Sequence, residues 1–263
     1  MANAQGKWIW YELMTTDADG AKAFYDAVVG WNIQTTHGDT DDYGFLLNAD
    51  GSMAGGLLHL TQDMLTHGAR PIWLGYIGVD DVDAMLPKIE AAGGKTLMPP
   101  RDIEMAGRIA MVADCCGAPF YIMAPQPMPG MENQESTAFS PTKLGSCAWN
   151  ELLAGNQANA IAFYSNLFGW TEPREPMDMG DMGQYTFIAE GGVDIGAIMQ
   201  KPQQVPVPMW NHYFRVPSIE AAKAAAEANG GTVIAGPMEV PGGDWIIQGI
   251  DPQGATFALV GAK

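Results

Sequence analysis

The sequence predicts an α+β protein made of two tandem domains, with curved and mostly antiparallel sheets. The first observation is an internal repeat in which three blocks return 139 positions later: WIWYEL (8–13), AFY (23–25) and GW (30–31) return as CAWNEL (147–152), AFY (162–164) and GW (169–170). The second observation is a weaker repeat inside each half, where a short strand, a capped helix and a glycine are followed by three short strands. We therefore expect four strand-helix-strand-strand-strand modules, two in each domain.

The length and a proline-rich segment predict where the domains meet. The chain has 263 residues, and a domain of about 130 residues buries roughly two thirds of its unfolded surface. Residues 125–130 (PQPMPG) open a stretch without apolar periodicity, which is typical of a linker. We expect the first domain over 1–127, a linker over 128–141 and the second domain over 142–263.

The first module of the first domain has clear helix signals. A strand over about 8–14 leads to Asp17, which is a good helix N-cap residue. The helix expected over about 19–29 has one apolar face, and Gly30 is expected to end it in the left-handed conformation. Strands over about 43–47 and 55–60 complete the module.

The second module of this domain repeats the pattern over about 74–123. A strand over 74–79 precedes Asp80 and Asp81 as caps, and a helix to residue 92 follows. Pro87 would cost about 3 kcal/mol inside that helix, unless the first turn starts late. Strands over about 108–112 and 120–123 follow it.

The second domain shows the same order of signals. A strand over about 212–216 precedes Ser218 as a cap, and a helix is expected over about 220–229.

Composition and charge exclude several classes of protein. The formal charge of −17 at pH 7 argues against nucleic acid or an anionic membrane as a partner. No apolar run reaches the roughly 18 residues that span a bilayer, and residues 1–6 start no signal peptide. Three cysteines, two of them adjacent, do not form a disulfide pattern. We expect a cytoplasmic protein.

The order of these motifs resembles a known superfamily. The strand, the Asp-capped helix with Phe-Tyr and the following Gly-Trp resemble the vicinal oxygen chelate superfamily, which includes glyoxalase I, bleomycin-resistance proteins and extradiol dioxygenases. Residues 251–257 (DPQGATF) resemble its closing turn, and residues 212–216 (HYFRV) resemble its mid-domain strand. The two-domain form looks most similar to Cfp30B-like hydroxylase or glyoxalase-like proteins of bacteria. The resemblance implies a cupped pocket in each domain.

The resemblance also implies four metal-ligand positions in each pocket, and these can be read from the sequence. They fall on Trp10, His59, Gly75 and Tyr121 in the first domain, and on Trp149, Met199, His212 and Ala258 in the second. A catalytic metal needs about three nitrogen or oxygen ligands from the protein, and each set offers one suitable donor. We expect no metal cofactor, with His59 and His212 as the residual ligand candidates and a divalent metal as the alternative.

Two glutamates are the candidate catalytic residues. Glu12 and Glu151 lie two residues beyond Trp10 and Trp149, so each is expected to share its tryptophan's strand face. A carboxylate in an apolar pocket has a raised pKa, as suits a general base that takes a proton next to a carbonyl group. The alternatives are a structural hydrogen-bond acceptor or a substitute metal ligand. His212 is a third catalytic candidate.

Three function classes remain open for a small-molecule ligand or substrate. They are a glyoxalase-like enzyme, a binding or sequestering protein of the bleomycin-resistance kind, and a metal-dependent dioxygenase or lyase. The candidate substrate-binding residues are Trp10, Trp149, Trp210, Tyr213, His59, Tyr121 and Met199. The chain is expected to be a monomer or a homodimer.

Overall fold

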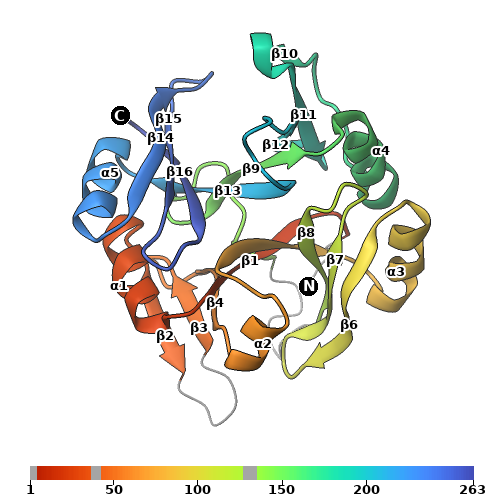
Figure 1. The fold of residues 1–263 in the computed structure, drawn as a ribbon, viewed down its shortest axis with the longest axis horizontal. Coiled ribbons are helices and arrows are strands. Elements are labelled where there is room, and N and C mark those ends of the chain that lie inside the picture. The colour runs from red at the N-terminus through yellow and green to blue at the C-terminus, as the bar shows by residue number, and fades with distance from the viewer. Residues whose placement is uncertain (1–4, 37–42, 127–134) are drawn as a thin grey trace. The chain divides into compact units, whose positions relative to one another are not determined.

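The computed structural model describes residues 5–36, 43–126 and 135–263 and contains two eight-stranded sheets (Figure 1). The first repeat contains β1 (Trp8–Thr15), α1 (Ala18–Val28), β2 (Asn32–Thr36), β3 (Tyr43–Leu47), β4 (Met53–His59), α2 (Gln62–Thr66), β5 (Ile72–Gly78), α3 (Val82–Ala91), β6 (Lys95–Ile103), β7 (Gly107–Ala113) and β8 (Pro119–Pro125). The second repeat contains β9 (Cys147–Ala154), α4 (Gln157–Phe168), β10 (Met177–Asp178), the 3-10 turn η1 (Gly180–Met182), β11 (Gln184–Glu190), β12 (Val193–Gln200), β13 (Met209–Val216), α5 (Ile219–Ala228), β14 (Thr232–Glu239), β15 (Trp245–Ile250) and β16 (Thr256–Gly261).

The order of strands confirms the predicted modules. The sheets run β2-β3-β4-β1-β5-β8-β7-β6 and β10-β11-β12-β9-β13-β16-β15-β14. Within each module the first and last strands pair in parallel and the remaining pairs are antiparallel. The parallel pairing is possible because a helix connects the first strand to the other three. The predicted α+β fold class is confirmed.

The predicted helix caps form as expected. Asp17, Asp81 and Ser218 each accept a hydrogen bond from the backbone amide three residues later. Gly30 has φ +86°, the left-handed value that glycine adopts without a steric penalty. These local interactions explain why short helices of moderate apolar content begin and end where they do.

Two local features were not settled by the sequence patterns. α3 starts at Val82 and continues through Pro87, so the proline lies in the helix interior and not in a late first turn. Packing of the buried face of α3 holds the helix in spite of the missing amide donor. The short helix α2 was not expected, and Thr61 caps it through Met64 N.

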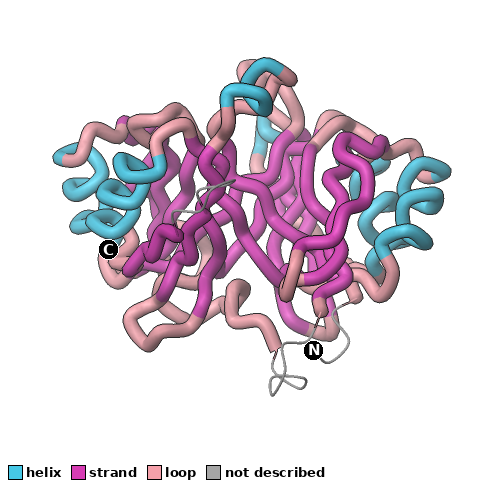
Figure 2. Tube along the Cα trace, turned by 90° about the horizontal axis from the view of Figure 1, so that it is seen from below, coloured by secondary structure: helices cyan, strands magenta, loops and turns pink. Residues whose placement is uncertain are grey.

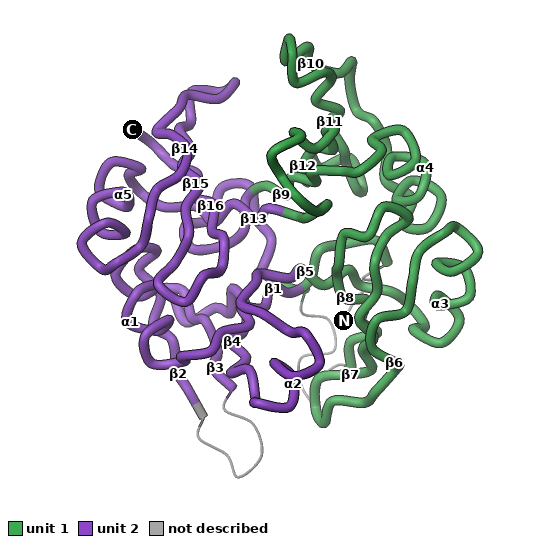
Figure 3. The backbone as a smooth tube through the Cα atoms, in the orientation of Figure 1, with its two compact units in different colours: residues 1–9, 75–136, 149–210 green, residues 10–74, 137–148, 211–263 purple. Residues whose placement is uncertain are grey.

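Two compact units divide the chain differently from the sequence repeats (Figure 3). Unit 1 contains residues 1–9, 75–136 and 149–210, and unit 2 contains residues 10–74, 137–148 and 211–263. Each unit therefore combines the first module of one repeat with the second module of the other. The predicted domain limits 1–127 and 142–263 stay predictions, and the predicted linker over 128–141 lies partly outside the described residues.

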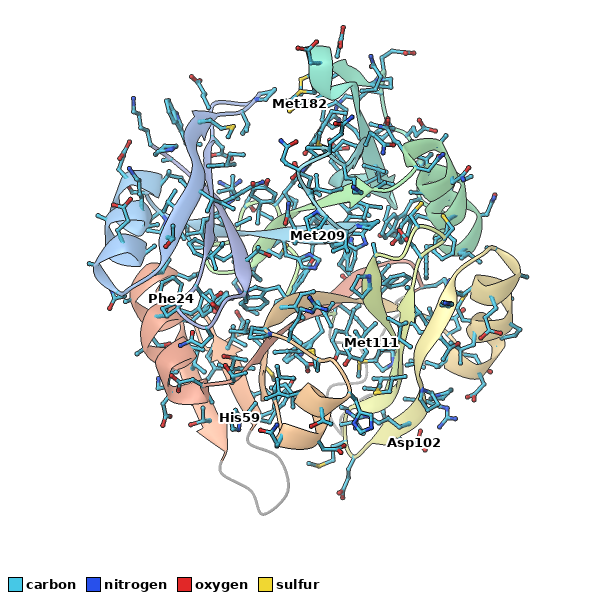
Figure 4. All side chains as sticks on the ribbon, in the orientation of Figure 1. Phe24, His59, Asp102, Met111, Met182 and Met209 are labelled. Atoms are coloured by element: carbon cyan, nitrogen blue, oxygen red, sulfur yellow. The ribbon has the colours of Figure 1, made fainter. Side chains whose placement is uncertain are left out.

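A buried hydrogen-bond network holds unit 2 together. The Tyr25 hydroxyl of α1 donates to Asp251 Oδ2 at 2.9 Å and accepts from Trp73 Nε1 at 2.9 Å. Asp251 Oδ1 also accepts from Gln253 N and Ala255 N, which shapes the turn before β16. In this unit α1 and α5 lie side by side at the edge of the strands (Figure 2), with Phe24 close to β16 (Figure 4).

Unit 1 repeats this network with residues of the other modules. The Tyr164 hydroxyl of α4 donates to Asp114 Oδ2 at 3.3 Å and accepts from Trp210 Nε1 at 2.9 Å. Asp114 Oδ1 accepts from Cys116 N and Ala118 N. The duplicated Phe-Tyr and Asp motifs thus serve to join modules of different repeats.

No helix in the described part of the chain combines the length and the apolar character needed to cross a membrane.

Candidate active site

A chain of three hydrogen-bonded side chains lies on one face of the first sheet, within unit 2. Trp10 and Glu12 are two residues apart on β1, so both side chains point to the same face. Trp10 Nε1 donates to the Tyr43 hydroxyl at 3.1 Å, and this hydroxyl donates to Glu12 Oε2 at 3.1 Å. Glu12 is 4% exposed. We call this arrangement the Trp–Tyr–Glu chain.

The same chain occurs in the second repeat, within unit 1. Trp149 Nε1 donates to the Tyr185 hydroxyl at 2.8 Å, and the hydroxyl donates to Glu151 Oε2 at 3.1 Å. Burial raises the pKa of Tyr185 well above its usual value, and the negative charge of Glu151 raises it further. Tyr185 therefore stays protonated near neutral pH and acts as the donor to the carboxylate.

The two tyrosines were missed in the sequence, although a signal for them exists. Tyr43 and Tyr185 each begin a Tyr-x-Phe segment, and the two segments are 142 positions apart. Phe45 and Phe187 pack edge-on against the tryptophan of their own repeat, with ring centroids 6.5 and 6.2 Å away. A search for the repeat beyond its strongest blocks could have found the Tyr-x-Phe segments.

Gly56 allows the Trp–Tyr–Glu chain of the first repeat to lie close against the sheet. Gly56 lies opposite Glu12 in the ladder of β1 and β4. A Cβ at this position would clash with the Tyr43 phenol and lie 3.1 Å from Trp10 Nε1. In the second repeat Ala197 lies opposite Glu151, so the position that corresponds to Gly56 carries a methyl group.

His212 faces the protein core. Its ring meets Tyr11 edge-on with centroids 4.9 Å apart, and His212 is 3% exposed. Tyr11 is next to Glu12 in sequence and so points to the other face of β1. Burial lowers the pKa of His212 to about 3, which keeps the imidazole neutral. The predicted catalytic role of His212 gains no support from this position.

Trp210 and Tyr213 point to opposite faces of β13. Trp210 is two residues before His212, is buried and donates to the Tyr164 hydroxyl, as described for unit 1. Tyr213 accepts a 2.6 Å hydrogen bond from Gln248 Nε2 on the other face. Trp210 thus packs in the core, and its predicted contact with substrate gains no support.

Tyr121 belongs to a separate aromatic pair in unit 1. It lies opposite Tyr76 in the ladder of β5 and β8, and the two rings stack with centroids 4.3 Å apart and an interplanar angle of 14°. Both side chains are buried, so the predicted contact of Tyr121 with substrate gains no support.

The strand register shows that His59 and Met199 are not at equivalent positions of the two repeats, although the resemblance to the superfamily placed them so. His59 lies opposite Thr15, and in the second repeat Gln200, not Met199, occupies the corresponding place opposite Ala154. His59 is three residues from Gly56, so it faces away from Glu12, and Figure 4 shows it at the end of β4 near α2. Its Nε2 lies 3.2 Å from the Thr16 carbonyl oxygen. Met199 lies opposite Tyr185 and shares the face of Glu151.

The residues at the ligand positions implied by the superfamily do not fit a divalent metal. Tryptophan, glycine and alanine offer no donor, and His59 and His212 point away from the faces that carry Glu12 and Tyr213. Across residues 5–36, 43–126 and 135–263, no three His, Cys, Asp or Glu side chains gather in a group that could hold an ion.

Comparisons with known proteins agree with the repeats and the fold. The family model described as Glyoxalase/Bleomycin resistance protein/Dioxygenase superfamily matches residues 8–122 and 143–259. "Putative glyoxylase CFP32" of Mycobacterium tuberculosis is 32% identical over 258 residues, covering 97% of this chain and 95% of the relative. "Anthracycline biosynthesis protein DnrV" of Streptomyces peucetius is 28% identical over 270 residues, covering 98% and 94%.

Solved structures share the fold at low sequence identity. The Mn(II)-bound glyoxalase from Novosphingobium aromaticivorans matches with a TM-score of 0.62 and 17% identity, over 98% of this chain and 82% of that chain. The 2,3-dioxygenase LapB from Pseudomonas sp. KL28 matches with a TM-score of 0.61 and 15% identity, over 100% and 94%. With the family model covering both repeats, the chain belongs to the glyoxalase/bleomycin resistance protein/dioxygenase superfamily.

Proposed function

We propose that this protein is a glyoxalase-like enzyme that acts on a small carbonyl-containing metabolite without the catalytic metal usual in its superfamily. Glu151 and Glu12 are the general bases in this proposal. The observation that carries it is the Trp–Tyr–Glu chain, which recurs with the same donors and acceptors in both repeats. The name of the mycobacterial relative, a glyoxylase, supports a carbonyl substrate.

The chemistry in this proposal is a proton transfer. The glutamate carboxylate takes the proton from the hydroxyl-bearing carbon next to the carbonyl group and returns it to the carbonyl carbon, while the hydroxyl proton passes to the former carbonyl oxygen, so the isomerisation is balanced without a redox partner. Tyr185 keeps its proton because its pKa is raised, and it fixes the orientation of the Glu151 carboxylate. Trp149 in turn fixes the tyrosine. Tyr185 is therefore a positioning residue.

Deuterium exchange tests this role directly. The exchange of the proton next to the carbonyl of α-hydroxy ketones and 2-oxo aldehyde hemithioacetals is followed by NMR in D₂O. Glu151→Gln and Glu12→Gln are expected to lower the rate on the order of a hundredfold at their own site, as loss of a general base does. Tyr185→Phe is expected to slow exchange and to change its pH profile. Exchange at the wild-type rate in the Glu12→Gln/Glu151→Gln double variant would refute the proposal.

Metal content tests the metal-free part separately. Elemental mass spectrometry of protein purified without chelators or an affinity tag is expected to find transition metal far below one equivalent per chain. One equivalent of iron, zinc, nickel or manganese would overturn this part and favour a dioxygenase or lyase.

Sedimentation distinguishes the monomer from the homodimer, which both stay predictions.

Ligand binding without chemistry is the second candidate function, and an exposed aromatic cluster favours it. Phe45 is 38% exposed and packs edge-on against Trp10 and Tyr43. The Streptomyces relative is named for anthracycline biosynthesis, which suggests polycyclic aromatic ligands for this cluster. Quenching of tryptophan fluorescence by such a ligand, with no deuterium exchange on any carbonyl compound, would support this function.

A further inference from the structure

The two Trp–Tyr–Glu chains differ in the charge of their surroundings. In the second repeat the Arg174 guanidinium carbon lies 3.8 Å above the centre of the Phe187 ring. Between Trp31 and Met53 in the first repeat the sequence contains no lysine or arginine. The aromatic wall of the Glu151 site therefore carries a cation, and the sequence segment around the Glu12 site supplies none.

The sheet register places this cation on the face of Glu151. Phe187 lies opposite Ala197, and Ala197 lies opposite Glu151. Directly opposed residues share a face, and neighbouring strands are about 4.8 Å apart, so the backbones of Phe187 and Glu151 are about 10 Å apart. Ala197 itself is fully buried, so a small compound that reaches from Arg174 towards Glu151 contacts the partly exposed rings of Phe187 and Trp149.

Arg174 has donors to offer such a compound. Its Nη1 is bonded to Asp194, and a guanidinium group carries five N–H donors in a planar fork. The side chains of Arg174 and Asp194 are 47% and 37% exposed, so a ligand can reach them. The chain as a whole has 30 acidic residues against 13 Lys and Arg, which repels anions at long range. A cation at the site offsets this repulsion locally.

We propose that Arg174 makes the Glu151 site selective for an anionic carbonyl compound, of the 2-oxo acid class, whose carboxylate it binds. The proposal rests on the proposed function of the Glu151 site and names its substrate class.

A matched pair of probes tests the selectivity. Benzoylformate and its methyl ester share shape and differ in charge, and tryptophan fluorescence reports the binding of each. Wild type is expected to bind the anion about five-fold more tightly than the ester, which is the worth of a half-exposed charge pair. Arg174→Gln is expected to reduce this preference to less than about two-fold, while the matched control Arg101→Gln, on the exposed strand β6, keeps it.

A second variant separates ligand binding from a structural ion pair. Asp194→Asn removes the same ion pair but leaves the cation, so it is expected to bind benzoylformate as tightly as wild type or more tightly. Equal loss of the anion preference in Arg174→Gln and Asp194→Asn would overturn the proposal. Wild-type binding of the anion that is no tighter than binding of the ester, or is absent, would overturn it too.

The outcome is distinguishable from failure of the proposed function. Glu151→Gln is expected to lower deuterium exchange at its own site on the order of a hundredfold and to keep the anion preference. If no exchange occurs in wild type but the preference depends on Arg174, the enzyme proposal fails and the binding site stands.

Discussion

Tyr25→Phe is expected to destabilise unit 2, because this hydroxyl joins modules of the two repeats. The variant keeps the aromatic ring and removes only the oxygen that donates to Asp251 and accepts from Trp73. Tyr25 is fully buried, so neither water nor a new side chain replaces the lost partner. Asp251 Oδ1 still accepts hydrogen bonds from two backbone amides in the variant. Only Asp251 Oδ2 and Trp73 Nε1 therefore lose a hydrogen-bond partner.

The size of the expected destabilisation follows from the hydrogen bonds that Asp251 and Trp73 lose. A hydrogen bond to a charged group contributes about 1.5–3 kcal/mol, and an unpaired buried donor costs about 1–3 kcal/mol. We expect the free energy of unfolding to fall by about 3 kcal/mol and the melting temperature by roughly 6 °C at this chain length. Tyr164→Phe is expected to cost less, about 2 kcal/mol, because its bond to Asp114 is 3.3 Å long against 2.9 Å for Tyr25 to Asp251.

Urea unfolding followed by circular dichroism and tryptophan fluorescence measures both variants. The Tyr25→Phe/Asp251→Asn double variant completes a cycle in which the coupling is expected to be about 1–2 kcal/mol. Tyr25 and Tyr164 lie in different units, so their effects are expected to add. A cost below about 0.5 kcal/mol for Tyr25→Phe, or no coupling to Asp251, would refute the role of this bond.

Three further predictions concern the site and the core. Gly56→Ala is expected to displace the Tyr43 phenol from Glu12 and to lower the free energy of unfolding, measured in urea, by about 2 kcal/mol. The reciprocal Ala197→Gly is expected to lower it by about 1 kcal/mol. A larger loss in Ala197→Gly than in Gly56→Ala would contradict the packing around Gly56. Burial lowers the pKa of His212 to about 3, below its unfolded value of 6.5. The stability that the neutral imidazole contributes to the folded state is therefore fully present above pH 6.5 and is lost as the pH falls towards 3. Between pH 7 and pH 5 wild type is therefore expected to lose about 2 kcal/mol that His212→Leu does not lose, and identical pH slopes would count against this burial. Burial raises the pKa of the Cys115 thiol to about 12, so iodoacetamide at pH 8 is expected to leave Cys115 unmodified in the folded protein and to label it in urea.

Much of the fold follows from patterns along the chain. The caps Asp17, Asp81 and Ser218 and the terminator Gly30 act within three or four residues, so neighbouring sequence is sufficient to predict them. The duplication of whole blocks predicts four equivalent modules for the same reason. Pro87 shows the limit, because packing of α3 outweighs a local preference.

The placement of Glu12 beside Trp10 was also predictable, since residues two apart on a strand share a face. Their partner Tyr43 was not, because it comes from β3, and the register between strands is not encoded in either strand alone. A slip of one residue reverses the face, which is why His59 and Met199 seemed equivalent in sequence and are not equivalent in the ladder.

The sequence by itself determined the modules, their helix ends and the pairing of each glutamate with a tryptophan, because these depend on short-range geometry. Only the tertiary structure decided that Tyr43 and Tyr185 complete those pairs, that His212 faces the core, and that each compact unit combines modules of both repeats. On the strand of His212 one face is buried (Trp210, His212, Phe214 and Val216) and the other is partly exposed apart from Tyr213, but this alternation does not tell which face meets the core and which a pocket. The direction is set by which strands and helices pack together, and that is fixed by contacts between residues far apart in the chain.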